Sequence, residues 1–318
     1  MKKVIFDTDI GIDDAMALLF LHHAPDVDLI AITTGFGNAS VSDTTRNALY
    51  MKERFNMSAA VYAGAATPVG SALGEGYADF VHGKNGLGDI PLTAPMCEAE
   101  AMPAAEAIVE LVRANPNALS FVAVGRMTNL ATALALDPEL PSLIKELVVM
   151  GGVFGYNGHR GNVSPVAEAN IAGDPLAADR VFTSGIPTTI VGLDVTAETV
   201  MNDAYIDQLR QTAGASGEFI YQISRFYFGF YEKVIGKAEC PIHDASAVAY
   251  LLRPDLYRTE AAVVRVATEG IAMGQTIHDS TRRVFATDDW LDLPTCNVCV
   301  GVDAPAVMAF YLSTLSEL

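Results

Sequence analysis

Short apolar runs alternate along the chain with longer segments that have helical spacing. Residues 4–6 form the first apolar run, and residues 15–21 have the composition of a helix that ends near Pro25. Apolar runs of four to eight residues are typical of strands that are buried on both faces, as in parallel sheets. The alternation predicts an α/β fold with a Rossmann-like, mostly parallel sheet flanked by helices, and a ligand site at the carboxyl ends of the strands.

The same pattern places the other elements. Further strands are predicted at residues 28–34, 60–64, 119–125, 147–150, 188–193, 262–266 and 283–286. Helices are predicted at residues 42–55, 104–114, from 128 onward, after Asp174-Pro175, over most of 198–230, and at 246–252 and 304–316. Internal repeats, low-complexity tracts and charged linkers are absent from the sequence, which favours a single domain over residues 1–318.

Four carboxylates follow the first predicted strand, in the stretch Asp-Thr-Asp-Ile-Gly-Ile-Asp-Asp at residues 7–14. Charges this close repel one another in a partly dry cleft unless a cation is present. Gly11 permits a sharp turn, so Asp9 and Asp14 can converge on one ion. The all-oxygen ligand set favours calcium or magnesium, and the flexible arrangement favours calcium. The alternative is that these acids only cap the helix and form the turn.

Composition excludes two classes of partner. The net charge is −18 and 51% of the 318 residues are hydrophobic. Such an acidic surface repels phosphate backbones and anionic lipids, so nucleic acid and membrane surfaces are not expected to bind.

The N-terminus lacks a signal-peptide core and no apolar run approaches about 18 residues, which predicts a cytoplasmic protein. Cys296 and Cys299 form a lone C-x-x-C that is expected to pack in a strand.

Other polar residues also follow predicted strands. Asn38 lies at the tip of a glycine-rich turn, and Asp194 directly follows the strand at 188–193. In a small and apolar segment, Glu168 is flanked by Asn162 and Asn170. Amides donate and accept hydrogen bonds whereas a carboxylate only accepts, so this trio is suited to binding several hydroxyl groups. Incidental loop chemistry is the alternative.

Histidines and tyrosines in the second half supply further candidates. His243 precedes Asp244 at a helix start, where it can donate a proton near neutral pH. Tyr227 and Tyr231 lie one helical turn apart on one face of a predicted helix. The two interpretations of this pair are an aromatic wall for a flat ring and core packing. In the first half, His82 lies in a glycine-rich loop over residues 74–95, either as a lid contact or as an exposed histidine. The pair His278-Asp279 is expected in a turn.

Together these residues resemble the inosine-uridine-preferring nucleoside hydrolase family over most of the chain. The motifs are the acidic cluster at 7–14, Gly37-Asn38, Gly125 with Thr128-Asn129, Met150-Gly151-Gly152, Asn162 with Ala167-Glu168 and Asn170, and His243-Asp244. A single motif of this kind is weak evidence, but the ordered set is highly specific.

The resemblance implies a calcium enzyme that cleaves the N-glycosidic bond of ribonucleosides with water. The implied calcium ligands are the carboxylates of Asp9, Asp14 and Asp244 and the backbone carbonyl of Val124. Asp9 would also be the general base, and His243 would protonate the leaving base. The implied substrate contacts are Asp13, Asn38, His82, Met150, Asn162, Glu168, Asn170, Tyr227 and Tyr231. The resemblance also implies a homotetramer or homodimer.

Three positions depart from the usual family pattern. Ile10 stands where proline is usual, Arg126-Met127 replaces Pro-Leu, and Ala169 replaces an aromatic residue, which removes a substrate contact. His243 and the tyrosines favour a pyrimidine or mixed base preference. Two alternatives are a nucleoside-binding protein without turnover and a haloacid-dehalogenase-like phosphatase, whose nucleophile loop also has Asp-x-Asp after a strand.

Overall fold

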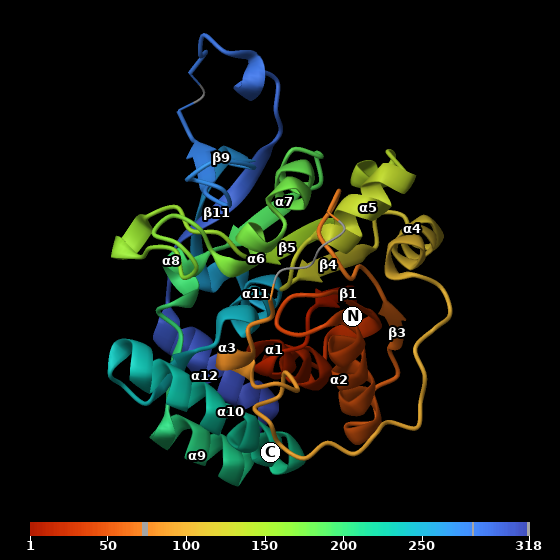
Figure 1. Cartoon of the computed structure of the whole chain (residues 1–318), viewed down its shortest axis with the longest axis vertical. Coiled ribbons are helices and arrows are strands. Elements are labelled where there is room, and N and C mark those ends of the chain that lie inside the picture. Colours follow the sequence, from red (N-terminus) through yellow and green to blue (C-terminus); the bar gives the residue numbers. More distant parts are fainter. Residues whose placement is uncertain (72–75, 282, 317–318) are drawn as a thin grey trace.

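The computed structural model describes residues 1–71, 76–281 and 283–316. Its strands are β1 (Lys2–Thr8), β2 (Val27–Thr34), β3 (Ala60–Ala63), β4 (Leu119–Ala123), β5 (Glu146–Met150), β6 (Thr188–Val191), β7 (Val200–Asn202), β8 (Glu239–Pro241), β9 (Tyr257–Val266), β10 (Thr276–Asp279) and β11 (Thr295–Val302). In these residues nine strands form one sheet in the order β10-β9-β11-β6-β5-β4-β1-β2-β3 (Figure 1). Adjacent strands from β3 to β11 are parallel, and β9 is antiparallel to both its neighbours. The predicted α/β fold with a mostly parallel sheet is confirmed.

Helices cover both faces of the sheet. They are α1 (Ile12–His23), α2 (Val41–Arg54), α3 (Asp79–His82), α4 (Ala104–Ala114), α5 (Thr128–Leu136), α6 (Ala169–Gly173), α7 (Pro175–Phe182), α8 (Leu193–Thr196), α9 (Asp203–Thr212), α10 (Gly214–Ile235), α11 (His243–Leu252) and α12 (Ala304–Leu315). α1, α10, α11 and α12 share one hydrophobic cluster, whereas α4, α5 and α7 belong to the other.

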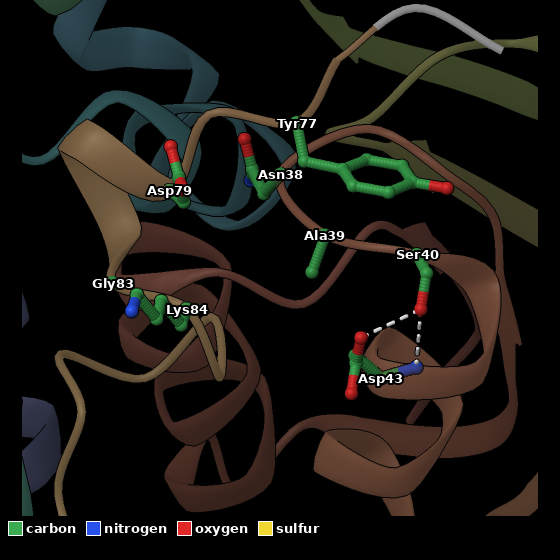
Figure 2. A pocket seen from close by; sticks show the side chains of 8 residues that line it. All are labelled: Asn38, Ala39, Ser40, Asp43, Tyr77, Asp79, Gly83 and Lys84. Carbon is green, nitrogen blue, oxygen red and sulfur yellow. Dashed lines mark hydrogen bonds between the residues drawn. The ribbon is translucent and has the colours of Figure 1, made fainter.

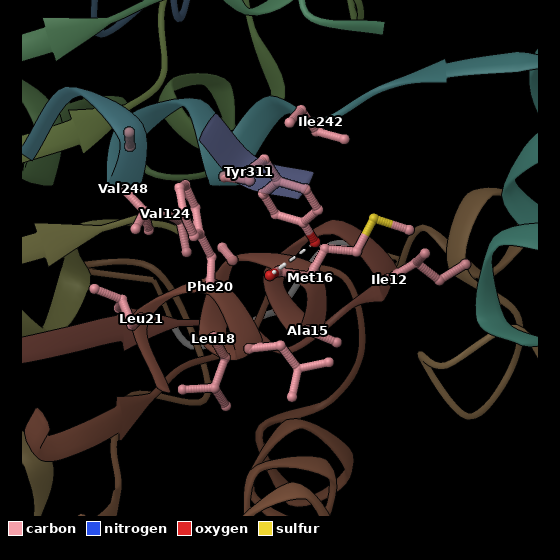
Figure 3. Close-up of a cluster of buried hydrophobic side chains, with 14 of the residues drawn as sticks. Ile12, Ala15, Met16, Leu18, Phe20, Leu21, Val124, Ile242, Val248 and Tyr311 are labelled. Carbon is pink, nitrogen blue, oxygen red and sulfur yellow. Dashed lines mark hydrogen bonds between the residues drawn. The ribbon is translucent and has the colours of Figure 1, made fainter. Parts of the chain in front are cut away.

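Alternate residues of the central strands enter the two clusters. In β1, Val4 and Phe6 belong to the first cluster and Ile5 to the second, and in β5 the neighbours Val148 and Val149 divide in the same way. Because both faces of these strands are buried, their sequence has to be continuously apolar. Figure 3 shows the first cluster around α1, where the hydroxyl of Tyr311 donates a hydrogen bond to a backbone carbonyl of α1.

Strand register brings the polar residues to one edge. Asp7 lies opposite Ala123 of β4, and Thr8 lies opposite Thr34 of β2. Asp9 and Val124 therefore leave the sheet at the same carboxyl edge, as expected for neighbouring parallel strands.

Two predictions near the C-terminus were wrong. The described residues 283–286 contain no strand, and the outer antiparallel strand is β10, so His278 and Asp279 lie in a strand and not in a turn. The pair Val284 and Phe285 suggested a strand, but their side chains are 91% and 44% exposed. They belong to a segment that extends beyond β9 and β11 (Figure 1). His278 hydrogen-bonds through Nε2 to the hydroxyl of Tyr156 at 2.8 Å.

The cysteine prediction is confirmed. Cys296 and Cys299 are buried in β11 as free thiols and enter opposite hydrophobic clusters, so they pack and do not converge on a metal. Among the described residues, none of the helices has both the length and the hydropathy needed to cross a membrane. The single domain over residues 1–318 stays a prediction, which one cooperative unfolding transition would support.

Candidate active site

The turn between β1 and α1 positions two of the predicted acids. Asp14, in the first turn of α1, accepts hydrogen bonds from the backbone N–H of Gly11 at 2.8 Å and from the hydroxyl of Thr8 at 2.6 Å. The side-chain amide of Asn38 also donates to Asp14, at 2.8 Å. Asp9 accepts the backbone N–H of Asn38 on Oδ2 at 2.8 Å, and its Oδ1 is buried without a partner. Asn38 therefore holds both acids from the neighbouring strand end.

A third element completes an acidic cluster. Carboxylate oxygens of Asp13, Asp14 and Asp244 lie within 4.8 Å of one another, and all three side chains are buried. Asp244 comes from the first turn of α11, far along the chain. The structure thus brings together two of the three predicted carboxylate ligands, Asp14 and Asp244. Asp13, predicted as a substrate contact, joins them, whereas Asp9 is not part of this group of three.

Burial strongly favours the protonated form of these acids when no cation is present. It raises the pKa of Asp13 to about 6, and it raises the pKa of Asp14, which the charge of Asp13 raises further. Burial also raises the pKa of Asp9 and of Asp244 well above the usual range, and neighbouring carboxylates add to both shifts. Like charges in a region of low dielectric are stabilised by a cation between them.

The residues present fit a hard divalent cation. The donors are carboxylate oxygens, and Oδ1 of Asp9 and Oδ1 of Asp13 are buried without hydrogen-bond partners. The backbone carbonyl of Val124 lies at the same edge, where it accepts the side-chain amide of Asn170 at 2.8 Å. An all-oxygen set of this kind is typical of calcium and magnesium sites.

His82 is part of the buried site. It lies at the end of α3 and is 5% exposed, so the alternative of an exposed loop histidine was wrong. The backbone N–H of Ile12 donates to its Nδ1 at 3.1 Å, which leaves Nε2 as a donor. Its ring stacks on Tyr227 with 5.8 Å between centroids. Burial lowers its pKa to about 4, so the ring is neutral at pH 7. Residues 74 and 75 of the predicted loop lie outside the described residues.

A chain of hydroxyl and imidazole groups connects His243 to the acidic cluster. Nδ1 of His243 lies 2.7 Å from the hydroxyl of Thr196, and Nε2 lies 3.1 Å from the hydroxyl of Tyr231. The hydroxyls of Tyr231 and Tyr227 are 3.5 Å apart, and Tyr227 donates to Asp13 at 3.3 Å. The two tyrosines come from one face of α10, as predicted. Burial lowers the pKa of His243 to about 4.

The predicted ribose contacts lie around α6. Glu168 caps this helix and is buried, and its carboxylate accepts three backbone N–H groups, from Gly152 at 2.9 Å, Asn170 at 2.9 Å and Ile171 at 3.2 Å. The side-chain amide of Asn170 also reaches the carbonyl of Met150 at 3.2 Å. These contacts bring Glu168, Asn170 and Met150 together at the end of β5.

Asn162 lies outside the buried cluster. Its side chain is exposed and accepts the backbone N–H of Ala169 at 3.0 Å. Asp194, which also follows a strand, accepts the backbone N–H groups of Phe154 and Tyr156 at 2.8 and 2.6 Å. It therefore anchors the loop after β5.

Two neighbouring hollows share part of their lining, and the larger one reaches Asp9. Figure 2 shows the smaller, in which Tyr77 lies near Asn38, and Lys84 lies beside Gly83. Its volume is about 160 Å³. The larger, of about 340 Å³, shares Asn38 and Tyr77 with it and is also lined by Asp9 and Asn170. The sequence pattern predicted Asp9, Asn38 and Asn170 as site residues but not Tyr77. Nothing in the spacing of residues indicated this position, because Tyr77 comes to lie beside Asn38 only in the folded chain.

Comparison with known proteins agrees with this geometry. The model of the family described as inosine-uridine preferring nucleoside hydrolase matches residues 4–309. The chain belongs to this family. The resemblance stated from the motifs is thus confirmed, and so is the predicted enzyme class, a hydrolase of the N-glycosidic bond of nucleosides.

Relatives of this nucleoside hydrolase match over most of its length. Uridine nucleosidase 1 of Arabidopsis thaliana is 37% identical over 318 residues, which cover 99% of this chain and 94% of the relative. The pyrimidine-specific ribonucleoside hydrolase RihB of Escherichia coli (strain SE11) is 35% identical over 280 residues, 87% of each chain.

Solved structures share the fold of this nucleoside hydrolase. A plant nucleoside hydrolase, the PpNRh1 enzyme, superposes with a TM-score of 0.95 and 33% identity, over 100% of this chain and 99% of the other. A purine-preferring ribonucleoside hydrolase from Gardnerella vaginalis superposes with a TM-score of 0.91 and 34% identity, over 99% and 98% of the two chains.

Proposed function

We propose that this nucleoside hydrolase is a calcium-dependent ribonucleoside hydrolase that gives ribose and the free base, with a pyrimidine or mixed base preference. The observation that supports it best is the buried cluster of Asp13, Asp14 and Asp244 next to Asp9, with two carboxylate oxygens that lack partners. Buried acids without a compensating cation are costly, so this cluster suits an enzyme that uses one.

The calcium ligands in this proposal are the carboxylates of Asp9, Asp14 and Asp244 and the carbonyl of Val124. When bound, the ion would hold the two vicinal ribose hydroxyls and lower the pKa of the attacking water. The ribose is held by Asp13, Asn38, Met150, Asn162, Glu168 and Asn170. Calcium is favoured over magnesium because the acids come from two separate elements, a flexible arrangement that suits the larger ion.

Asp9 acts as the general base. Its Oδ2 is already held by the backbone N–H of Asn38, so Oδ1 is the oxygen that accepts the proton of the attacking water. The sugar acquires positive charge as the bond to the base weakens, and the surrounding carboxylates stabilise it. Fixing Asp9 through Oδ2 leaves Oδ1 free to orient the attacking water.

His243 serves the departing base. The leaving ring gains negative charge and requires a proton or a hydrogen bond. Its lowered pKa makes the imidazole neutral at pH 7, so when the hydroxyl of Thr196 donates to Nδ1, the proton of His243 lies on Nε2. The hydroxyls of Tyr231 and Tyr227 would then replace that proton. The ring of His82, stacked on Tyr227, flanks the base.

Base preference in the proposal follows from the same residues. The uridine nucleosidase and the pyrimidine-specific hydrolase among the relatives support a pyrimidine substrate, and the purine-preferring structural neighbour supports mixed use. Trp290 is the single tryptophan and lines a separate hollow of the extended segment near β9, so it is not available to stack on a purine.

The test is release of ribose from uridine, cytidine, inosine and adenosine, with chelator and after calcium is restored. The proposal predicts turnover of uridine that chelator abolishes and calcium restores better than magnesium. Inorganic phosphate from phosphomonoesters without ribose from uridine would favour the phosphatase alternative. Tight binding of intact inosine without hydrolysis over hours would favour a binding protein.

A pair of variants tests the assignment of the base. Asp9→Ala should abolish turnover, whereas the matched variant Asp203→Ala, at an exposed position on α9, should keep it. Near-normal activity of Asp9→Ala would refute the assignment. We also propose a homotetramer or homodimer and a cytoplasmic location, which light scattering and cell fractionation would test.

A further inference from the structure

Arg126 is the departure from the family pattern that brings a positive charge close enough to act on the proposed general base, Asp9. Arg126 follows β4, and its guanidinium carbon lies 4.6 Å from the centre of the Phe36 ring, a stacked cation–π arrangement. A Cβ at position 173 would fall 1.9 Å from Nε of Arg126, so Gly173 is what lets the side chain lie against α6. Two separate elements therefore fix the position of this guanidinium.

Within residues 1–71, 76–281 and 283–316, the charge of Arg126 has no direct partner. Its Nη1 is buried and has no hydrogen-bond acceptor, and Arg126 takes part in none of the ion pairs found in the described part of the chain. Burial raises the pKa of Asp9 and of Glu168, and the guanidinium opposes both shifts from a distance. A buried N–H donor that lacks an acceptor is costly and calls for an oxygen that the described residues do not supply.

The larger of the two hollows has room for an oxygen that would accept from Nη1 of Arg126. Arg126 lines it together with Asp9 and Asn170, and Ser164 is also part of the lining. Its volume of about 340 Å³ is in the usual range for small-molecule sites. On the side of α6 the lining consists of small residues, among them Ala169, Ala172 and Gly173.

The hollow belongs to the ribose side of the site. Its lining includes Asp9 and Asn170, which are proposed to act on the sugar, but not His243, Tyr227 or Tyr231, which are proposed to serve the base. An anion bound there would be attached to the sugar. With the vicinal hydroxyls assigned to the acidic cluster, the remaining point of attachment is the 5′ carbon.

We propose that Arg126 forms a subsite for a phosphate group on the 5′ carbon of the ribose, so that the enzyme also accepts ribonucleoside 5′-monophosphates. This inference rests on the proposed function and extends its substrate class. In the reaction the water oxygen bonds to C1′, the bond from C1′ to the base nitrogen breaks, and the base leaves with a proton. The phosphate ester stays intact, and the products are ribose 5-phosphate and the free base. A planar guanidinium binds two phosphate oxygens at once, and Ser164 supplies a further donor.

The test compares uridine 5′-monophosphate with uridine in the calcium-loaded enzyme. The quantity is the ratio of the two kcat/KM values, because it cancels any general loss of activity. Arg126→Met should lower this ratio by about 10- to 100-fold, the size of a charge-assisted hydrogen bond. Arg126→Lys keeps the positive charge but loses the planar guanidinium that binds two oxygens, so it should lower the ratio less. Arg210→Met removes an exposed arginine that stacks on Tyr221 at 4.1 Å, and it should leave the ratio at the wild-type value.

A binding measurement separates this inference from the proposed function. Ribose 5-phosphate should raise the melting temperature of the wild-type protein more than ribose does, and Arg126→Met should remove the difference.

If uridine is hydrolysed but the ratio and the melting shift are the same in Arg126→Met, the phosphate subsite is wrong and the proposed function stands. If both substrates lose activity equally, Arg126 positions the acids and the subsite is again wrong. If uridine is not hydrolysed, the proposed function fails, and the melting shift alone decides on the subsite.

Discussion

Removal of divalent cations is expected to make thermal stability fall as the pH rises above neutral. Burial raises the pKa of Asp9 and of Asp244 well above the usual carboxylate range, and neighbouring acids raise both further. The folded, cation-free protein therefore keeps protons that the unfolded chain, with ordinary pKa values, has lost. The free energy of unfolding then decreases with pH. His82 and His243, whose pKa values are lowered to about 4, are neutral in both states above pH 7 and add no slope.

The size of the effect follows from the number of retained protons. One retained proton changes the free energy of unfolding by about 1.4 kcal/mol per pH unit. For 318 residues the entropy of unfolding is about 0.7 kcal/mol/K, so each proton lowers the melting temperature by about 2 °C per pH unit. Between pH 7 and 8.5 we expect a fall of about 3 °C for one retained proton and about 6 °C for two.

Differential scanning calorimetry with chelator and with saturating calcium measures this slope. Calcium should remove it, because bound carboxylates stay ionised in the folded protein. Asp244→Asn should make the slope in chelator shallower, whereas Asp203→Asn, at an exposed position, should not change it. The reasoning is refuted by a melting temperature in chelator that is constant or rises over this range, or by a slope that calcium leaves unchanged.

Three further variants test separate parts of the structure. Tyr231→Phe breaks the contact with Nε2 of His243 and should lower kcat for uridine by about 100-fold, with little change in KM. An unchanged kcat in steady-state assays would exclude this hydroxyl from proton transfer. Gly37→Ala places a Cβ 1.7 Å from Oδ2 of Asp9, so the enzyme should lose activity. The free energy of unfolding, measured by urea denaturation, should fall by about 1–3 kcal/mol. Normal activity and stability of this variant would mean that Asp9 is held differently. Tyr311→Phe removes the hydrogen bond to the carbonyl of Met16 and should cost about 1 kcal/mol in the same assay, with ribose release unaffected.

The central sheet was predictable because its strands are buried on both faces. Runs such as residues 4–6 and 147–150 have to be apolar throughout, and this leaves a clear signal. The sequence of the outer strand β10 carries no such apolar signal. It includes the polar pair His278 and Asp279, and its pairing with β9 depends on tertiary contact. The exposed residues Val284 and Phe285 had the stronger apolar signal and misled the prediction.

Site residues were predictable where the strand ends position them. Asp9 and Asn38 follow neighbouring parallel strands, so topology alone brings them to one edge. The partner of His243 was not predictable, because Thr196 lies on α8 and reaches the imidazole only after α11 packs beside it. The place of Asp13 among the clustered acids depends on the orientation of the first turn of α1, which residue spacing does not fix.

A crystal structure of the protein grown with calcium tests the central claim most directly. The account predicts one calcium ion bound at about 2.3–2.6 Å by carboxylates of Asp9, Asp14 and Asp244 and by the carbonyl of Val124. Acids too far apart to share an ion, or calcium bound elsewhere, would contradict it.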